Sequence, residues 1–174
     1  PGIGKSRVRH ELVARVNVTG DARVIVASAD PVSAGSSLGL VRQLVRAVVG
    51  LRTGDPDDTQ RRCLVAHLAP LFAGTELDRA IDFLGQLAGL RAESAADTPG
   101  AIGEWMRRSF EAWIEALCGE RPLLIVLEDL HWGDAPSVAY LSGALRRAAE
   151  RPLAVLALAR PEVHDVFPRL WVEA

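Results

Sequence analysis

The segment Pro1-Gly2-Ile3-Gly4-Lys5-Ser6 (PGIGKS) decides the fold class of this 174-residue chain. It matches the end of the phosphate-binding loop G-x-x-x-x-G-K-[ST], whose first glycine would lie two positions before Pro1. In such a loop the backbone N–H groups point at phosphate oxygens, the lysine contacts the β- and γ-phosphates, and the serine hydroxyl ligates Mg²⁺. The segment therefore predicts a nucleotide-phosphate site formed by Gly2, Ile3, Gly4, Lys5, Ser6 and Arg7.

The residues after this loop predict an amphipathic helix. Apolar side chains recur at helical spacing at Val8, Leu12, Val13 and Val16, and the segment 17–21 (NVTGD) ends the pattern. The N-terminus of such a helix adds partial positive charge where a phosphate would bind. A plain Gly-Pro turn would also account for the six letters, so the rest of the chain has to decide between the two interpretations.

Composition excludes several classes of function. The net charge is −2, and 24% of the residues are charged, so no basic surface indicates direct nucleic-acid binding. The sequence has no run of eighteen apolar residues and no secretory signal, which predicts a cytoplasmic protein without a membrane span. Cys63 and Cys118 are predicted to be two buried thiols. His10, His67 and His164 lack metal-ligand spacing and are predicted to lie on the surface.

Three apolar runs predict the strands of a parallel sheet: residues 23–27 (RVIVA), 123–127 (LLIVL) and 153–158 (LAVLAL). Helical periodicity predicts helices over 40–49, 59–72, 75–90 and 102–117, with a surface loop at 92–100. A Thr75…Asp78 pair resembles a capping box for the third of these helices. Asp134, followed by Pro136, predicts the N-cap of one more helix. Strands that alternate with helices in this way indicate an α/β fold.

Charged residues follow two of these strands, at the edge where α/β sheets bind ligands. Glu128 and Asp129 end the run 123–127, and Arg160 follows the run 153–158. Nucleotide hydrolysis needs a carboxylate for Mg²⁺ and a group that orients the attacking water, and a nearby cation stabilises the γ-phosphate. We therefore expect Glu128, Asp129 and Arg160 to be catalytic. A solvated turn at 128–129, or a surface Arg160, is the alternative interpretation.

The motifs PGIGKS, LLIVLEDLHWGD and LALARPE together resemble the signal-transduction ATPases with numerous domains, the STAND class of AAA-like P-loop NTPases. The similarity extends to DPVSAGSSLGLVRQLVRAVVG and RPEVHDVFPRLW. It implies a Walker A pair at Lys5 and Ser6, a Walker B pair at Glu128 and Asp129, and a sensor arginine at Arg160. The family's Walker B pair usually starts with Asp, whereas Glu128 occupies that place here. We therefore expect Ser6 to hold Mg²⁺ together with either Glu128 or Asp129. For the motif His131-Trp132 we predict a structural role.

These observations predict a three-layer AAA-like P-loop NTPase with a parallel sheet. Residues 1–174 would be a partial ATPase domain, truncated at both ends, without its first strand and C-terminal lid. If the missing first strand is counted as strand one, we expect a helical insertion between the second and third strands. The resemblance implies an ATP-binding, slowly ATP-hydrolysing switch core of a bacterial regulator, with ATP and Mg²⁺ as cofactors. Expected partners are kinase, helical-repeat or DNA-binding domains of the parent chain, and self-association. A nucleotide-independent scaffold is the main alternative, and a small-molecule kinase is disfavoured.

Overall fold

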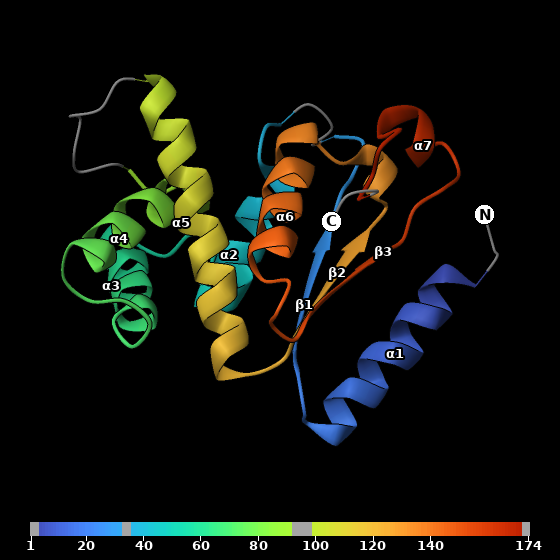
Figure 1. The fold of residues 1–174 in the computed structure, drawn as a ribbon, viewed down its shortest axis with the longest axis horizontal. Helices are drawn as coiled ribbons and strands as arrows, with labels where there is room; N and C mark the ends of the chain where they lie inside the picture. The colour runs from blue at the N-terminus through green and yellow to red at the C-terminus, as the bar shows by residue number, and fades with distance from the viewer. Residues whose placement is uncertain (1–3, 33–35, 92–98, 172–174) are drawn as a thin grey trace.

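The computed structural model describes residues 4–32, 36–91 and 99–171, without the side chains of residues 99–101 (Figure 1). The elements in chain order are α1 (Lys5–Thr19), β1 (Arg23–Ser28), α2 (Gly39–Val49), α3 (Asp57–Leu68), α4 (Gly74–Ala88), α5 (Pro99–Glu120), β2 (Leu123–Glu128), the 3-10 turn η1 (Leu130–Trp132), α6 (Ala135–Arg147), β3 (Leu153–Ala157) and α7 (Val163–Val166). The alternation of strands and helices confirms the predicted α/β class.

The three strands form one parallel sheet in the order β1-β2-β3, with β2 in the centre. Arg23 is opposite Leu123, and Ser28 is opposite Glu128 at the other end of β1. Four helices, α2 to α5, lie between β1 and β2 in the chain, which agrees with the predicted helical insertion. The carboxyl ends of all three strands point to the same edge of the sheet (Figure 1). Strand-end residues of β1, β2 and β3 therefore share one edge.

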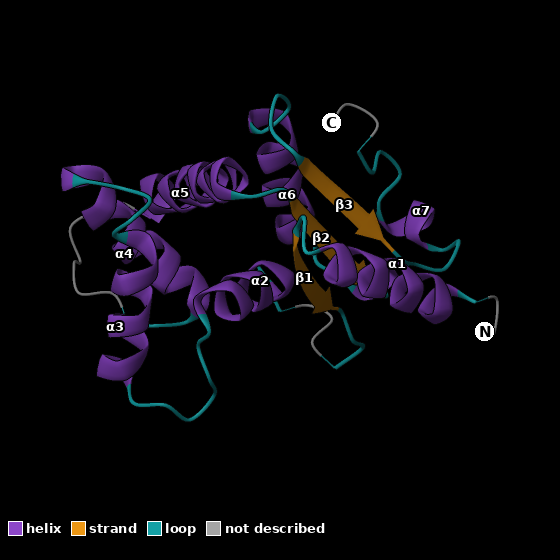
Figure 2. Ribbon diagram, turned by 90° about the horizontal axis from the view of Figure 1, so that it is seen from below, coloured by secondary structure: helices purple, strands orange, loops and turns teal. Residues whose placement is uncertain are grey.

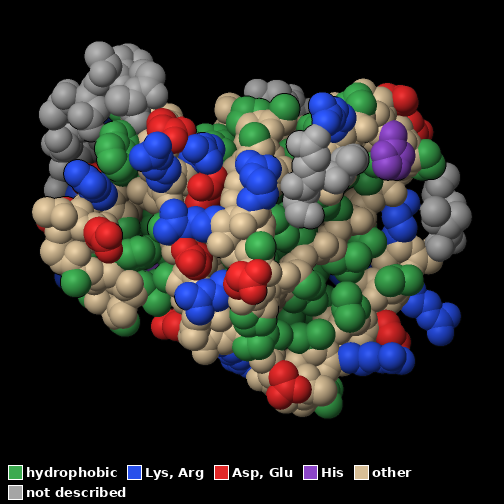
Figure 3. All heavy atoms as spheres, in the orientation of Figure 1, with side chains coloured by type: hydrophobic (Ala, Val, Ile, Leu, Met, Phe, Trp, Pro, Cys, Tyr) green, Lys and Arg blue, Asp and Glu red, His purple; other side chains and the backbone are tan. Residues whose placement is uncertain are grey.

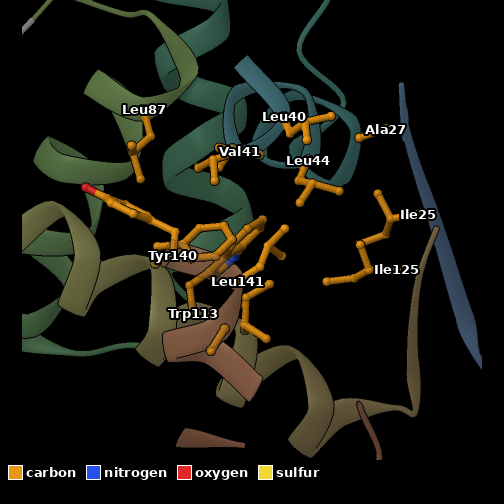
Figure 4. Close-up of a cluster of buried hydrophobic side chains, with 14 of the residues drawn as sticks. Ile25, Ala27, Leu40, Val41, Leu44, Leu87, Trp113, Ile125, Tyr140 and Leu141 are labelled. Carbon is orange, nitrogen blue, oxygen red and sulfur yellow. The ribbon is translucent and has the colours of Figure 1, made fainter. Parts of the chain in front are cut away.

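The core lies between one face of the sheet and the helices α2, α5 and α6 (Figures 2 and 4). Ile25 and Ile125 point from the sheet toward Leu44 of α2 and Leu141 of α6, and all four side chains are buried. Trp113 of α5 is fully buried in the same cluster. The apolar residues of β2 are buried along the whole strand, as expected for the central strand of a parallel sheet.

Of the described helices, α1 lies over the opposite face of the sheet (Figure 2). No residue of α1 is fully buried, although the helix runs for 15 residues. Val26 of β1 is 38% exposed on this side, and Ala154 of β3 is exposed as well. This face therefore remains thinly covered in comparison with the face that packs against α2, α5 and α6.

Several local predictions need correction. Helix α4 begins at Gly74 after the N-cap Ala73 and has no side-chain cap, so the Thr75…Asp78 capping box is wrong. Cys118 is buried as predicted, but Cys63 is exposed because it lies on the outer side of α3. His10 and His164 are exposed as predicted, whereas His67 is half-buried against Trp113. The predicted loop at 92–100 falls largely outside the described residues, and α5 already begins at Pro99.

Candidate nucleotide-binding site

Helix α1 begins directly after Gly4, as the phosphate-loop pattern predicts. Gly4 has φ 87° and ψ 5°, a left-handed conformation that glycine adopts without the penalty that other residues incur. The N-cap Gly4 has no side chain, and among the described residues no side-chain cap satisfies the N–H groups of the first turn, which can therefore bind an anion. Gly2 and Ile3, two of the predicted binding residues, lie outside the described residues. The described part of the loop therefore starts at Gly4, with Lys5, Ser6 and Arg7 in the first helical turn.

One stripe of α1 is turned toward the protein. The half-buried positions of the helix are Lys5, Arg9, Leu12, Val13 and Val16, and the remaining positions are exposed. This spacing of three and four residues is that of a single helical face. Lys5 therefore lies on the protected face, whereas Ser6 and Arg7 are exposed beside it.

An ion pair connects this stripe to the end of strand β2. The Nη1 atom of Arg9 donates to Oε2 of Glu128 at 2.8 Å. Arg9 follows Lys5 by four positions and Ser6 by three, so the three side chains are neighbours on the helix surface. Glu128 is thus held next to the helical face that begins with the phosphate-loop residues. This contact brings together two parts of the predicted site that are more than a hundred residues apart in sequence.

Asp129 has an unusual backbone conformation. Its φ of 50° and ψ of 42° lie in the left-handed region, which aspartate tolerates better than most residues. Its carbonyl accepts the N–H of Trp132 at 2.8 Å, and the next N–H, that of Leu130, binds the carbonyl of Leu158 at 3.1 Å. These bonds hold the turn in place after β2. Backbone strain of this kind clusters at functional sites, and the Asp129 side chain is exposed there.

The structure does not bring Arg160 into contact with the other predicted catalytic residues. Strand β3 ends at Ala157, so Arg160 lies three positions beyond the strand instead of at its end. Its side chain is exposed, and no described residue pairs with it, whereas its carbonyl accepts the N–H of Val163 at 3.0 Å. A role as a γ-phosphate sensor therefore stays a prediction for Arg160.

The motif His131-Trp132 forms the short turn η1 after Asp129. The two rings are tilted against each other with centroids 5.2 Å apart. Both ring nitrogens of His131 are buried and have no hydrogen-bond partner within the described parts of the chain. The predicted structural role of His131 is therefore not provided by hydrogen bonds of its ring to the described residues. Trp132 is 40% exposed, so the pair is only partly packed.

The chemistry of the site residues fits a magnesium–nucleotide complex. Within the ranges that the structure describes, no group of three or more His, Cys, Asp or Glu side chains could hold a metal ion by itself. Mg²⁺ seldom uses such cages and is usually bound by one or two carboxylates together with substrate phosphates. Ser6, Glu128 and Asp129 could supply oxygen ligands to such an ion, one hydroxyl and two carboxylates. A bound Mg²⁺ ion would neutralise charge on the phosphates, while Lys5 and the N-terminus of α1 would hold them.

Comparison with known protein families identifies the family of the chain but does not test the opening segment by itself. Residues 1–156 match the family described as "AAA ATPase domain". The chain belongs to the AAA ATPase domain family. An uncharacterised protein of Rhizobium meliloti (strain 1021) is 28% identical over 178 residues, and the match covers 99% of this chain. The chain spans 16% of the length of that relative. No solved structure matches this chain.

Membership of the AAA ATPase domain family implies that the domain binds a nucleotide. None of the helices in the described ranges has the length and apolarity to cross a membrane. Arg9 is the residue of this region that sequence reasoning missed. Its position four residues after Lys5, on the same stripe as Leu12 and Val16, was the available signal.

Proposed function

We propose that this AAA ATPase domain binds Mg·ATP and hydrolyses it slowly, as the switch core of a larger regulatory protein. The Arg9–Glu128 contact carries the proposal, because it seats the strand-end carboxylate beside the helix that starts with Gly4, Lys5 and Ser6. The family membership supports nucleotide binding independently of this geometry. A scaffold would have no use for a lysine on the protected face of α1 or for an uncapped helix N-terminus.

The roles of the site residues follow from their chemistry. Lys5 and the N–H groups of the first turn of α1 would hold the β- and γ-phosphates, and Ser6 would ligate Mg²⁺. Glu128 or Asp129 would hold the metal through its carboxylate, and the other would orient the attacking water. We assign the metal to Glu128, because its side chain lies against α1, and the water to the exposed Asp129.

We also propose that a further strand completes the sheet beside β3. A groove of about 570 Å³ lies between α1 and the sheet, next to the edge of β3 that pairs with no described strand. Its lining is largely apolar: Leu12, Val16, Ala22, Pro122, Leu123, Leu124, Pro152, Leu153, Ala154, Val155 and Leu156. Figure 3 shows hydrophobic side chains gathered on this face. An apolar groove beside an unpaired strand edge has the shape and chemistry that an additional β-strand requires.

The regulatory part of the proposal rests on the resemblance to STAND ATPases and on length. Because the chain spans 16% of its Rhizobium relative, that relative has room for many further domains. We propose that kinase, helical-repeat or DNA-binding domains of the parent chain respond to the nucleotide state of this module. Self-association of the module in the ATP-bound state would be the usual way to transmit that state.

Lys5 offers a direct test, because it is the only lysine in the sequence. An acylating reagent specific for ε-amines should modify Lys5 in the free full-length protein, and Mg·ATP should protect it. Peptide mapping by mass spectrometry separates Lys5 from the α-amine and from lysines elsewhere in the parent chain. If Lys5 is acylated as fast at saturating Mg·ATP as in the free protein, the proposed phosphate contact is contradicted.

A matched pair of variants measures how much the contact between Lys5 and phosphate contributes to the affinity for Mg·ATP. Lys5→Ala removes a charged contact to phosphate, which should weaken Mg·ATP binding by roughly tenfold to a hundredfold. Arg15→Ala removes a cation from the exposed side of the same helix, where it pairs only with Glu11, and should leave the affinity unchanged. Equal affinities for Lys5→Ala and wild type in isothermal titration would rule out the proposed function.

A further inference from the structure

The proposed function uses the Arg9–Glu128 ion pair to place the carboxylate beside α1, but it does not say what a cation bound to that carboxylate does when a metal binds. Arg9 is the second cation on the protected stripe of α1, one helical turn after Lys5. Its guanidinium and the Glu128 carboxylate are 32% and 23% exposed, and their 2.8 Å contact is partly shielded from water. Within the described parts of the chain, this ion pair joins α1 to the sheet, whereas the Arg15–Glu11 pair lies within the helix.

The carboxylate that Arg9 binds is the one we assign to the metal. A guanidinium that donates to a carboxylate oxygen compensates its charge and occupies one of its lone pairs. Arg9 contacts Oε2 and leaves Oε1 free, but a divalent cation draws on the same negative charge and is repelled by a guanidinium at short range. Arg9 and a metal ion therefore compete for Glu128 through charge.

We propose that Arg9 is a built-in competitor of Mg²⁺ for Glu128, so that loading of the metal–nucleotide complex requires release of the Arg9–Glu128 ion pair. This inference rests on the proposed function, and it adds the regulation of that site. In this structure the pair holds α1 against the end of β2. Release of Glu128 removes that restraint, so the seating of α1 on the sheet depends on whether the metal is bound.

The opposite role for Arg9 predicts the opposite sign. If the ion pair merely positions Glu128 for the metal, removal of Arg9 leaves the carboxylate less well placed and weakens Mg·nucleotide binding. If Arg9 competes with the metal, its removal frees the carboxylate and strengthens that binding. The direction of the change therefore separates the two roles, without any measurement of turnover.

The test compares Arg9→Gln with Arg15→Gln, a matched loss of charge on the same helix. Binding of a non-hydrolysable ATP analogue to the full chain is measured by calorimetry over a range of Mg²⁺ concentrations and again with a chelator. We expect Arg9→Gln to bind the Mg²⁺ complex about three- to tenfold more tightly, the size of one charge-assisted contact, and to need less Mg²⁺ for half-saturation. Without Mg²⁺, its affinity should be equal to that of wild type or weaker. Arg15→Gln should match wild type in both conditions.

A second background confirms that the effect acts through Glu128. In a Glu128→Gln protein, the additional Arg9→Gln change should leave the affinity for the Mg²⁺ complex unchanged. Unchanged or weaker Mg²⁺-dependent binding by Arg9→Gln, in a protein whose wild type binds the analogue, overturns this inference alone. Failure of the wild type to bind at any Mg²⁺ concentration overturns the proposed function instead.

Arg9→Lys keeps the comparison decisive if Arg9→Gln does not fold. Lysine retains the charge but lacks the planar fork that fits a carboxylate, so it holds Glu128 less firmly. We expect a smaller gain of Mg²⁺-dependent affinity in the same direction, of about twofold. An Arg9→Lys protein with wild-type or lower affinity for the Mg²⁺ complex contradicts the proposed competition.

Discussion

The N–H of Leu38 donates to Oδ1 of Asp134 at 2.8 Å, which links the turn before α2 to the N-cap residue of α6. The same oxygen accepts the N–H of Ser137 at 2.8 Å, and Oδ2 accepts the N–H of Gly39 at 3.1 Å. One carboxylate therefore caps two helices. Leu38 has a φ of 62°, a strained conformation for leucine, and the bonds to Asp134 help to hold it.

Asp134→Ala should destabilise the domain by about 2–3 kcal/mol, because it removes an N-cap and leaves two further N–H groups unpaired. Asp134→Asn keeps one acceptor oxygen and should lose less. Asp78→Ala is the control, since the predicted cap at that position is absent and Asp78 is exposed. Urea denaturation followed by circular dichroism measures all three. Equal midpoints for Asp134→Ala and Asp78→Ala would contradict the double-cap interpretation.

Gly143 of α6 allows the close approach of α5. A Cβ atom at Gly143 would overlap Oε1 of Glu111, which is 7% exposed and is paired with Arg107. Gly143→Ala should therefore destabilise the domain by about 1–3 kcal/mol, despite the better helix propensity of alanine. Gly119→Ala in α5 meets nothing within 4 Å and should stabilise the domain, by up to about 1 kcal/mol. Thermal melts of the two variants should shift in opposite directions, and a common direction would contradict this explanation.

Much of the fold was readable because its signals are local. The run 123–127 is apolar on both faces, and only a central parallel strand buries both, so β2 was found with nearly correct bounds. Asp134 followed by Pro136 likewise marks a helix start by chemistry within four residues. The Thr75…Asp78 pattern led to a wrong prediction because α4 begins at Gly74, after the N-cap Ala73, and no side chain caps it there.

The features that sequence missed depend on contacts between distant segments. Nothing near Arg9 in the sequence shows that it reaches Glu128, because the pairing is created by the packing of α1 on the end of β2. The second role of Asp134, toward Leu38, and the burial of His67 beneath Trp113 also arise between elements distant in the chain. Arg160 shows the converse case, since a position near a strand end did not produce a contact with the site.

His67 should make the stability of the domain depend on pH. Its Nε2 atom accepts the Nε1–H of Trp113 at 3.0 Å, which requires the neutral ring. Burial lowers the pKa of His67 below its ordinary value of 6.5, and the charge of Arg23 lowers it further, against an opposing effect of Glu120. As the pH falls, His67 therefore takes up its proton at a higher pH in the unfolded chain than in the folded domain. The stabilising contribution is fully present above pH 6.5 and is lost as the pH falls through the lower folded-state pKa.

The comparison of wild type with His67→Gln isolates this effect, since glutamine also offers an acceptor to Trp113 but does not titrate. Between pH 7 and pH 5 the wild type should lose stability relative to the variant, with a slope of at most about 1.4 kcal/mol per pH unit for one proton. Urea titrations at several pH values measure the difference. Parallel stability curves for the two proteins would contradict a neutral, buried His67.

Loss of the Asp129 carboxylate should impair hydrolysis, whereas loss of the Glu128 carboxylate should impair the Mg²⁺ dependence of binding. Asp129→Asn keeps the size of the side chain but removes its charge, so it should bind Mg·ATP nearly as wild type and hydrolyse it far more slowly. Glu128→Gln should weaken the dependence of binding on Mg²⁺. Binding calorimetry and single-turnover hydrolysis on the same preparations test both statements. If Asp129→Asn loses Mg²⁺-dependent binding while Glu128→Gln loses only turnover, the two roles are exchanged.

The groove between α1 and β3 should make residues 1–174 associate when they are expressed alone. A strand with three or four large apolar side chains in this groove would contribute roughly 5–10 kcal/mol, which is comparable to the net stability of a whole domain. An open strand edge beside such a surface is a template for pairing with another copy. We therefore expect sedimentation velocity to show association that increases with protein concentration, together with a broad thermal transition.

Ala154→Lys places a charge on the exposed part of β3 within the groove and should suppress this association. Ala14→Lys, on the exposed side of α1, should not, because it lies outside the groove. The difference between the two variants identifies the surface, since both add the same charge to the chain. A monomeric wild-type protein with a sharp, cooperative melt at high concentration would show instead that the groove needs no occupant, and that the three described strands and α1 are stable as they stand.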